Sequence, residues 1–130
     1  MDIIRHKPQG SSVSGPYFPA VEVKEKEFCQ LFVSGQGTKN PLTGERVLGA
    51  IEDQTVAVMN NLKLVIEGCG FSMAKVVKVT IFLTNMDDFE AVNDIYRDYF
   101  PEGTFPARST VAVKELPGGQ SIEIDAIVVR

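Results

Sequence analysis

The sequence predicts an α+β fold: one mostly antiparallel sheet with two helices packed on one of its faces. Three observations lead to this prediction. Segments with the two-residue alternation of strands come early, two segments with helical spacing then flank a further strand, and alternating apolar residues return at the end. A chain of 130 residues without an internal linker is expected to form a single domain over residues 1–130.

The clearest early strand is expected over residues 27–36. There Cys29, Leu31 and Val33 alternate with Phe28, Gln30, Phe32 and Ser34, and Gly35 marks the end of the strand. Residues 15–24 are expected to give one or two further strands at an edge or a turn, because their two prolines cannot donate ladder hydrogen bonds.

Two helices are expected after this strand. Apolar residues follow helical spacing over residues 50–68, where Gly68 and Gly70 end the pattern. Residues 75–84 are rich in β-branched side chains and predict a strand. Asn85 is then placed to cap a second helix. The apolar positions of that helix are Phe89, Val92, Tyr96 and Tyr99.

The last segment is expected to be a β-hairpin, with residues 109–115 and 121–130 joined by an LPGG turn. If both helices cover one face of the sheet, the other face exposes apolar side chains to water. Such a face predicts an oligomer that buries it. The side chains expected there are Phe32, Phe82, Ile127 and Val129.

Composition excludes several classes of function. The net charge of −4 and the lack of a basic run argue against nucleic-acid binding. Neither a membrane span nor a signal peptide is present, so a cytoplasmic protein is expected, with an organellar form left open. Cys29 and Cys69 are expected to be buried free thiols. His6 is the only histidine, so a Ser-His-Asp or Cys-His site is not expected, and no metal-binding or phosphate motif occurs.

Four polar residues remain at predicted strand ends: Tyr17, Ser34, Arg108 and Glu123. Pro106 restricts the backbone just before Arg108, so its guanidinium is expected to be held in place, where it can grip a carboxylate through two hydrogen bonds. Taken alone, Arg108 could still be a surface arginine, and Glu123 a solvated carboxylate.

The expected hairpin also sets a distance between the two charged candidates. If the turn pairs residue 111 with about residue 123, Arg108 and Glu123 lie about 10 Å apart. This is too far for a salt bridge but leaves room for a small anionic substrate and a water molecule.

Several motifs, in order and spacing, resemble a known family. They are GPY at 15–17, SGQ at 34–36, NPLTGE at 40–45, VVKVTIFLTNMDDFEAVNDIY at 76–96, FPARSTV at 105–111 and IEIDAIV at 122–128. With nearly the whole chain covered, the sequence is similar to the reactive intermediate deaminases, the RidA or YjgF family. The resemblance implies a chorismate-mutase-like fold and a homotrimer whose sheets form a central barrel, with active sites between subunits.

The resemblance also implies a reaction. Members hydrolyse the enamines and imines that pyridoxal-phosphate dehydratases release from serine and threonine, such as 2-aminoacrylate and 2-aminocrotonate. The products are a 2-keto acid and ammonia, and no cofactor is required. By the same resemblance, Arg108 grips the substrate carboxylate, and Glu123 orients or deprotonates the attacking water.

The remaining site residues also follow from the resemblance. Tyr17 and Ser34 are polar members of the cleft, with Tyr17 grouped with the catalytic residues. The backbone at Gly35 and Ser109 would donate hydrogen bonds to the ligand. Phe89 and Asn93 correspond to a lining position and a helix position of the family.

Two departures from the family pattern bear on the substrate. Many relatives have cysteine in place of Ser109, and relatives often follow SGQ with a hydrophobic residue and proline, where this chain has Gly37 and Thr38. Three alternatives stay open: a trimer that binds 2-keto acids as a sensor without turnover, deamination of a larger intermediate, and, with less support, an endoribonuclease or translation inhibitor.

Overall fold

The computed structural model describes all 130 residues, and its strands form one six-stranded sheet in the order β1-β2-β3-β6-β4-β5. The strands are β1 (Asp2–His6), β2 (Ala20–Glu25), β3 (Phe28–Gln36), β4 (Val76–Leu83), β5 (Ala107–Ala112) and β6 (Ile122–Val129). The two α-helices are α1 (Ile51–Gly68) and α2 (Phe89–Tyr96).

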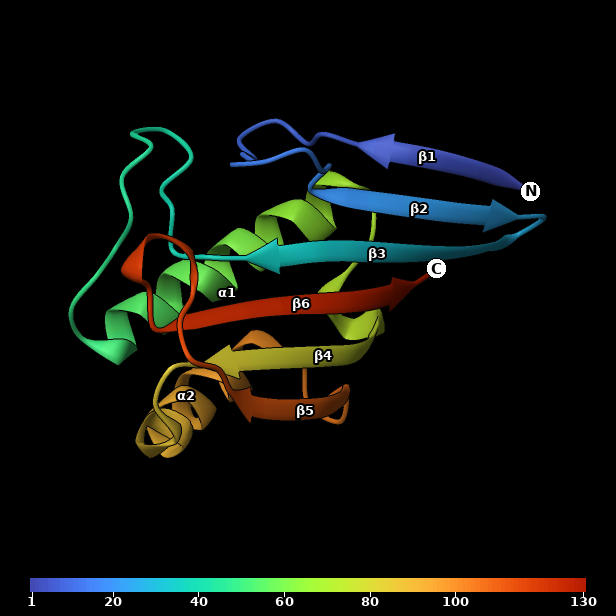
Figure 1. Ribbon diagram of the computed structural model, residues 1–130. Helices are drawn as coiled ribbons and strands as arrows, with labels where there is room; N and C mark the ends of the chain where they lie inside the picture. Colours follow the sequence, from blue (N-terminus) through green and yellow to red (C-terminus); the bar gives the residue numbers. More distant parts are fainter.

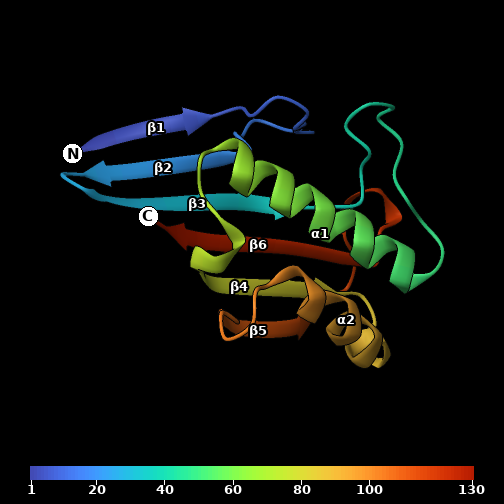
Figure 2. The ribbon, with the colours of Figure 1, turned by 180° about the vertical axis from the view of Figure 1, so that it is seen from behind.

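Both helices lie on the same face of the sheet, as the two opposite views show (Figures 1 and 2). Every neighbouring pair of strands is antiparallel except β4 and β5, which are parallel. The predicted α+β class, with a mostly antiparallel sheet and two helices on one face, is confirmed.

The predicted C-terminal hairpin is wrong, because β5 and β6 do not pair. Instead β6 lies between β3 and β4, and β5 pairs with the other side of β4 at the edge of the sheet. The helix between β4 and β5 provides the long crossover that parallel strands need. Burial decides the position of β6, whose alternate residues are almost fully buried. Pro117–Gly119 form a short 3-10 turn in place of a hairpin turn.

Strand β1, which forms the other edge of the sheet, was not predicted from the sequence. Its sequence DIIRH shows no regular alternation, and four of its five residues are exposed. It pairs with β2, in the register Ile4↔Glu22. The proline-containing segment before Ala20 is not a strand, so residues 15–24 contribute one strand rather than two.

Both predicted helices are present. In α1 the buried residues follow helical spacing and face the sheet, and Ala50 precedes the first turn. Asn85 caps as predicted: its side-chain Oδ1 accepts a hydrogen bond of 2.9 Å from the backbone N–H of Asp87. The segment it caps starts as a 3-10 turn, continues as α2 and ends in a second 3-10 turn at Arg97–Tyr99.

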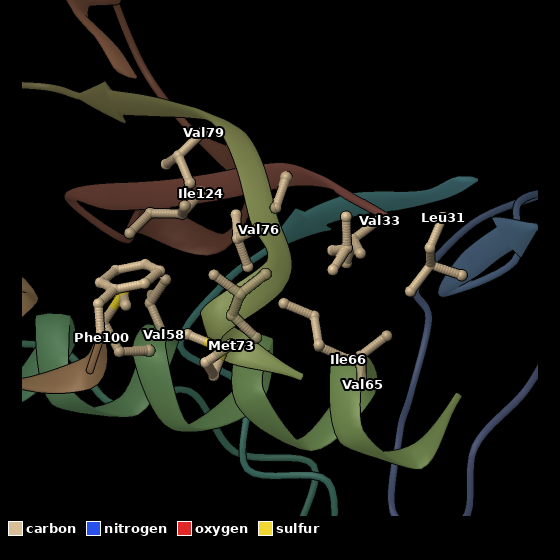
Figure 3. Close-up of a cluster of buried hydrophobic side chains, with 14 of the residues drawn as sticks. Leu31, Val33, Val58, Val65, Ile66, Met73, Val76, Val79, Phe100 and Ile124 are labelled. Atoms are coloured by element: carbon tan, nitrogen blue, oxygen red, sulfur yellow. The ribbon is translucent and has the colours of Figure 1, made fainter. Parts of the chain in front are cut away.

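The core fills the space between α1 and the sheet (Figure 3). Leu31, Ile124 and Val58 are all completely buried there, and they come from β3, β6 and α1. Cys29 and Cys69 are buried free thiols, as predicted. Figure 3 shows Val33 and Ile66 facing each other across this layer.

The helix-free face of the sheet carries apolar side chains. Phe32 is 41% exposed, and Phe82, Ile127 and Val129 are partly exposed in the single chain. The expectation of an apolar, uncovered face therefore holds for the chain described here. No helix combines the length and apolar character needed to cross a membrane.

Candidate active site

Arg108 lies on edge strand β5 and packs against α2. Its Nη2 donates a hydrogen bond of 2.6 Å to Oδ1 of Asn93. Its guanidinium carbon lies 5.5 Å from the ring centre of Phe89 and 4.9 Å from that of Tyr96, so two aromatic rings hold the cation. Since no carboxylate lies within 4 Å of Arg108, most of its donors remain available to an anionic ligand.

The helix spacing explains this arrangement. Phe89, Asn93 and Tyr96 occupy positions i, i+4 and i+7 of α2, and therefore share one face of the helix. Burial raises the pKa of Tyr96 to about 12, against the opposing charge of Arg108, so the phenol stays neutral. An open cavity of about 280 Å³ borders this group and is lined also by Phe105.

Glu123 lies on β6 and belongs to a different cavity. It alternates with the buried Ile122 and Ile124, as predicted, so it faces the other side of the sheet. A Cβ atom built on Gly35 would come within 2.5 Å of a carboxylate oxygen of Glu123, so a larger residue there would force the Glu123 side chain to move. The pairing of β3 with β6 shifts register between Val33 and Gln36, which places Gly35 in this irregularity.

Burial and the negative charge of Asp125 raise the pKa of Glu123 above its ordinary value, while Arg46 opposes the shift. Gln120 approaches the same carboxylate, with its Nε2 3.4 Å from Oε1. A raised pKa makes a carboxylate a stronger base toward a bound water. Glu123 therefore has the electrostatic setting of a general base.

Tyr17 and Gly35 line this second cavity together with Glu123. The Tyr17 side chain is 46% exposed, and its hydroxyl lies 3.4 Å from Oγ of Ser14. Ser34 donates its hydroxyl to the backbone oxygen of Phe18 at 2.7 Å, which ties the end of β3 to the loop that carries Tyr17.

The predicted residues thus form two groups within one chain. Tyr17, Ser34, Gly35 and Glu123 gather around β3 and β6, and we call them the Glu123 group. Phe89, Asn93 and Arg108 gather between α2 and β5, and we call them the Arg108 group. Ser109 belongs to neither contact network, since its Oγ bonds Nζ of Lys78 at 2.8 Å on the opposite face of β5.

The expected distance of about 10 Å between Arg108 and Glu123 is wrong, because it assumed a hairpin. Arg108 pairs with Val79 and Glu123 pairs with Phe82, on the two sides of β4. Two strand spacings across and three residues along give a separation of about 14 Å between their Cα atoms. Their side chains also leave opposite faces of the sheet.

Three residues of these cavities were not among the predicted ones. Tyr96 supports Arg108, and Gln120 and Arg46 lie beside Glu123. The helical spacing of Tyr96 relative to Asn93 was a usable signal. No sequence signal pointed to Gln120 and Arg46, because their meeting depends on how two loops fold together.

Comparison with known proteins supports one family. The family model described as Endoribonuclease L-PSP matches residues 9–130. The structure superposes on the YjgF gene product of Escherichia coli with a TM-score of 0.86 and 33% identity, covering 98% of both chains. The chain belongs to the RidA/YjgF family. This confirms the resemblance seen in the FPARSTV and IEIDAIV motifs.

Two further RidA/YjgF relatives are informative. A protein of Dermatophagoides farinae named 2-iminobutanoate/2-iminopropanoate deaminase is 44% identical over 115 residues, covering 88% of this chain and 86% of its own. The structure of Escherichia coli TdcF with bound serine has a TM-score of 0.85 and 31% identity, covering 98% of both chains. Most of the length is shared with each, and the fold is shared with the Escherichia coli structure.

Proposed function

We propose that this protein hydrolyses 2-imino acids, and the enamines that tautomerise to them, to 2-keto acids and ammonia. The observation that carries the proposal is the state of Arg108, whose guanidinium is fixed by Asn93 and two rings yet has no carboxylate partner in its own chain. A fixed guanidinium with free donors suits a substrate carboxylate. The names of relatives such as the mite protein agree with this substrate class.

The distance between the two groups suggests how the site is completed. Arg108 and Glu123 are too far apart, and on opposite faces, to act on one small molecule within one chain. The apolar helix-free face needs a protein partner, since side chains such as Phe32 are exposed on it. We infer a homotrimer in which the Arg108 group of one subunit faces the Glu123 group of its neighbour.

In the proposed reaction Arg108 binds the carboxylate of the protonated imine and Glu123 holds a water next to C2. Glu123 takes a proton from this water as its oxygen attacks C2, and the electrons of the C=N bond move to nitrogen. The carbinolamine that results then receives a proton on nitrogen from Glu123. The C–N bond breaks with its electron pair going to nitrogen, ammonia leaves, and the hydroxyl gives its proton to the Glu123 carboxylate as the C=O bond of the 2-keto acid forms.

The roles of the other residues follow from their contacts. Tyr17, which lines the same cavity as Glu123, is placed to bond the imine nitrogen or the water. Ser34 holds the Tyr17 loop through Phe18. Backbone N–H groups at Gly35 and Ser109 are proposed to donate to the ligand. No step requires a cofactor, because the protonated imine is already electrophilic.

The endoribonuclease activity in the name of the family model has little support in this chain. The only histidine, His6, bonds Glu22 at 2.8 Å in the β1–β2 pair, where it lines neither cavity. The net charge of −4 offers no general attraction for a phosphate backbone.

The test is a coupled assay in which a threonine dehydratase produces 2-iminobutanoate and keto-acid formation is followed. Wild type is expected to accelerate hydrolysis. Arg108→Ala should raise KM and lower kcat/KM by roughly 10- to 100-fold, and Glu123→Gln should lower kcat while 2-ketobutyrate still binds. A wild-type protein that binds 2-ketobutyrate but does not change the rate would instead be a carboxylate sensor.

A further inference from the structure

Arg46 occupies an unusual position beside Glu123. It lies in the loop between β3 and α1, where an isolated bridge pairs it with Lys39. Its side chain crosses the turn before β6 so closely that a Cβ on Gly118 would collide with the guanidinium. Gly118 has a φ of 70°, a conformation that also favours glycine. The loop and the turn therefore meet through the Arg46 side chain.

The guanidinium of Arg46 is held in a fixed place by Gln120. Its Nη1 donates a hydrogen bond of 3.0 Å to Oε1 of Gln120, which is only 2% exposed. The same oxygen accepts a bond of 2.9 Å from the backbone N–H of Thr38. A Cβ on Gly37 would overlap the Gln120 amide, so glycine at this position leaves the space that the Gln120 side chain occupies.

Most of the hydrogen-bonding capacity of Arg46 is unused. A guanidinium has five N–H donors, and here one of its groups is bonded within the protein. No carboxylate lies within 4 Å of it, although the side chain is half-buried. A partly desolvated, positioned guanidinium that makes no salt bridge is well suited to bind a carboxylate through two hydrogen bonds.

The cavity that Arg46 lines is the one that contains Glu123, Tyr17 and Gly35. Lys39 lines it as well, so two cations and one carboxylate border it. This local excess of positive charge stands out in a chain with a net charge of −4. The cavity therefore favours a ligand that carries negative charge at the end near Arg46.

We propose that Arg46 is a second anion-binding residue of the active site, and that this protein prefers 2-imino acids whose side chain ends in a carboxylate. This rests on the proposed function, in which Arg108 of the neighbouring subunit binds the first carboxylate and Glu123 acts at C2. The side chain of the substrate then extends toward Arg46. An aliphatic side chain would leave those donors without partners, which lowers its relative kcat/KM.

A different role for Arg46 makes a different prediction. If Arg46 only supplies a positive charge near Glu123, its loss impairs the base toward every substrate. Both kcat/KM values would then fall by the same factor, and the pH profile would move for both. A carboxylate-binding role changes the ratio between a dicarboxylic and an aliphatic substrate.

The experiment compares iminosuccinate, produced by an aspartate oxidase, with 2-iminobutanoate from a threonine dehydratase. Wild type should show the higher kcat/KM with iminosuccinate. Arg46→Met should lower the ratio of kcat/KM between iminosuccinate and 2-iminobutanoate by roughly 10- to 150-fold, because any effect of the lost charge on Glu123 is common to both substrates. Arg5→Met removes an exposed arginine on β1 and serves as the matched control, with both values unchanged.

Equilibrium binding keeps this inference separate from the proposed function. Calorimetry with 2-ketoglutarate and 2-ketobutyrate should show that wild type prefers the dicarboxylic acid and that Arg46→Met loses the preference, even if neither imine is turned over. Urea unfolding checks that Arg46→Met is folded. Arg46→Lys keeps the positive charge and should retain part of the preference for 2-ketoglutarate. The inference is overturned if wild type has no preference in binding or turnover, or if Arg46→Met lowers both substrates equally.

Discussion

Arg108 and Glu123 flank strand β4 on its two sides, with Arg108 paired to Val79 and Glu123 to Phe82. The first side chain packs on α2, and the second faces the helix-free side of the sheet. One chain therefore presents the proposed carboxylate-binding residue and the proposed base as separate groups. This separation is the basis of the first prediction.

Mixing two strongly impaired variants should restore activity. Arg108→Ala and Glu123→Gln each destroy one group, so a trimer with sites between subunits regains intact sites where the two variants meet. Random exchange of subunits at equal concentration would restore roughly a quarter of the sites. Keto-acid formation after unfolding and refolding the mixture measures the result. If the residues act within one chain, the mixture stays as inactive as its components.

The acid limb of the pH–rate profile should move when the charge of Asp125 is removed. The negative charge of Asp125 adds to burial in raising the pKa of Glu123. Removing that charge with Asp125→Asn should lower this pKa and move the acid limb of kcat/KM to lower pH. Asp53→Asn, an exposed change on α1, is the control and should leave the limb in place. An upward shift in Asp125→Asn would contradict the assignment of Glu123 as the base.

Glu123 should also lower the free energy of unfolding at neutral pH. Its folded-state pKa is raised above the unfolded value, so its favourable contribution is present at low pH and is lost as pH rises through the folded pKa. Glu123→Gln should therefore unfold at higher urea concentration than wild type at about pH 7, with the difference vanishing at about pH 3. Glu67→Gln, an exposed change on α1, should show no such pattern. A variant less stable than wild type at neutral pH would refute the prediction.

Gly35 should be essential because of Glu123 alone. Alanine at position 35 would place a Cβ within 2.5 Å of the carboxylate and displace it. Gly35→Ala is expected to lower kcat by at least roughly 10-fold without preventing folding. The double variant with Glu123→Gln should be no slower than Glu123→Gln alone, because the displaced group is already missing. Additive losses would show that Gly35 acts through something other than Glu123.

Tyr96→Phe should leave stability unchanged or slightly improved. The Tyr96 hydroxyl is buried without a hydrogen-bond partner, although its ring supports Arg108. Removing an unsatisfied buried hydroxyl costs nothing and relieves a desolvation penalty of about 1 kcal/mol. Urea unfolding measures the change, and Tyr96→Leu, which removes the ring, is the contrasting variant. A loss above about 1 kcal/mol in Tyr96→Phe would mean that the oligomer gives the hydroxyl a partner.

Local patterns predicted the elements of this fold well. The alternation around Leu31 and the helical spacing around Leu62 led to β3 and α1, because side-chain periodicity reflects which face is buried. The pairing of β6 was missed, since a turn signal at Pro117 is local whereas the position of a strand depends on contacts from the whole sheet. The helix between β4 and β5 was the better guide to parallel pairing.

Prediction of the site was limited in the same way. Arg108 and Glu123 came from motif resemblance and local reasoning, and their roles stay predictions. The structure shows Arg108 bonded to Asn93 and a raised pKa for Glu123. Their separation into two groups could not be seen without the sheet order. No pattern in the sequence pointed to Arg46, because its hydrogen bond with Gln120 joins two loops that lie far apart in the chain.

The place of β6 between β3 and β4 has a consequence during synthesis of the chain. Strands β1 to β3 emerge from the ribosome first, and β4 and β5 follow, but no direct pairing joins these two sets. Only β6, which is synthesised last, joins the two sets of strands, because it pairs with both β3 and β4. Until then each set has an open edge of unpaired backbone, which is the kind of surface that holdase chaperones protect and that aggregation uses.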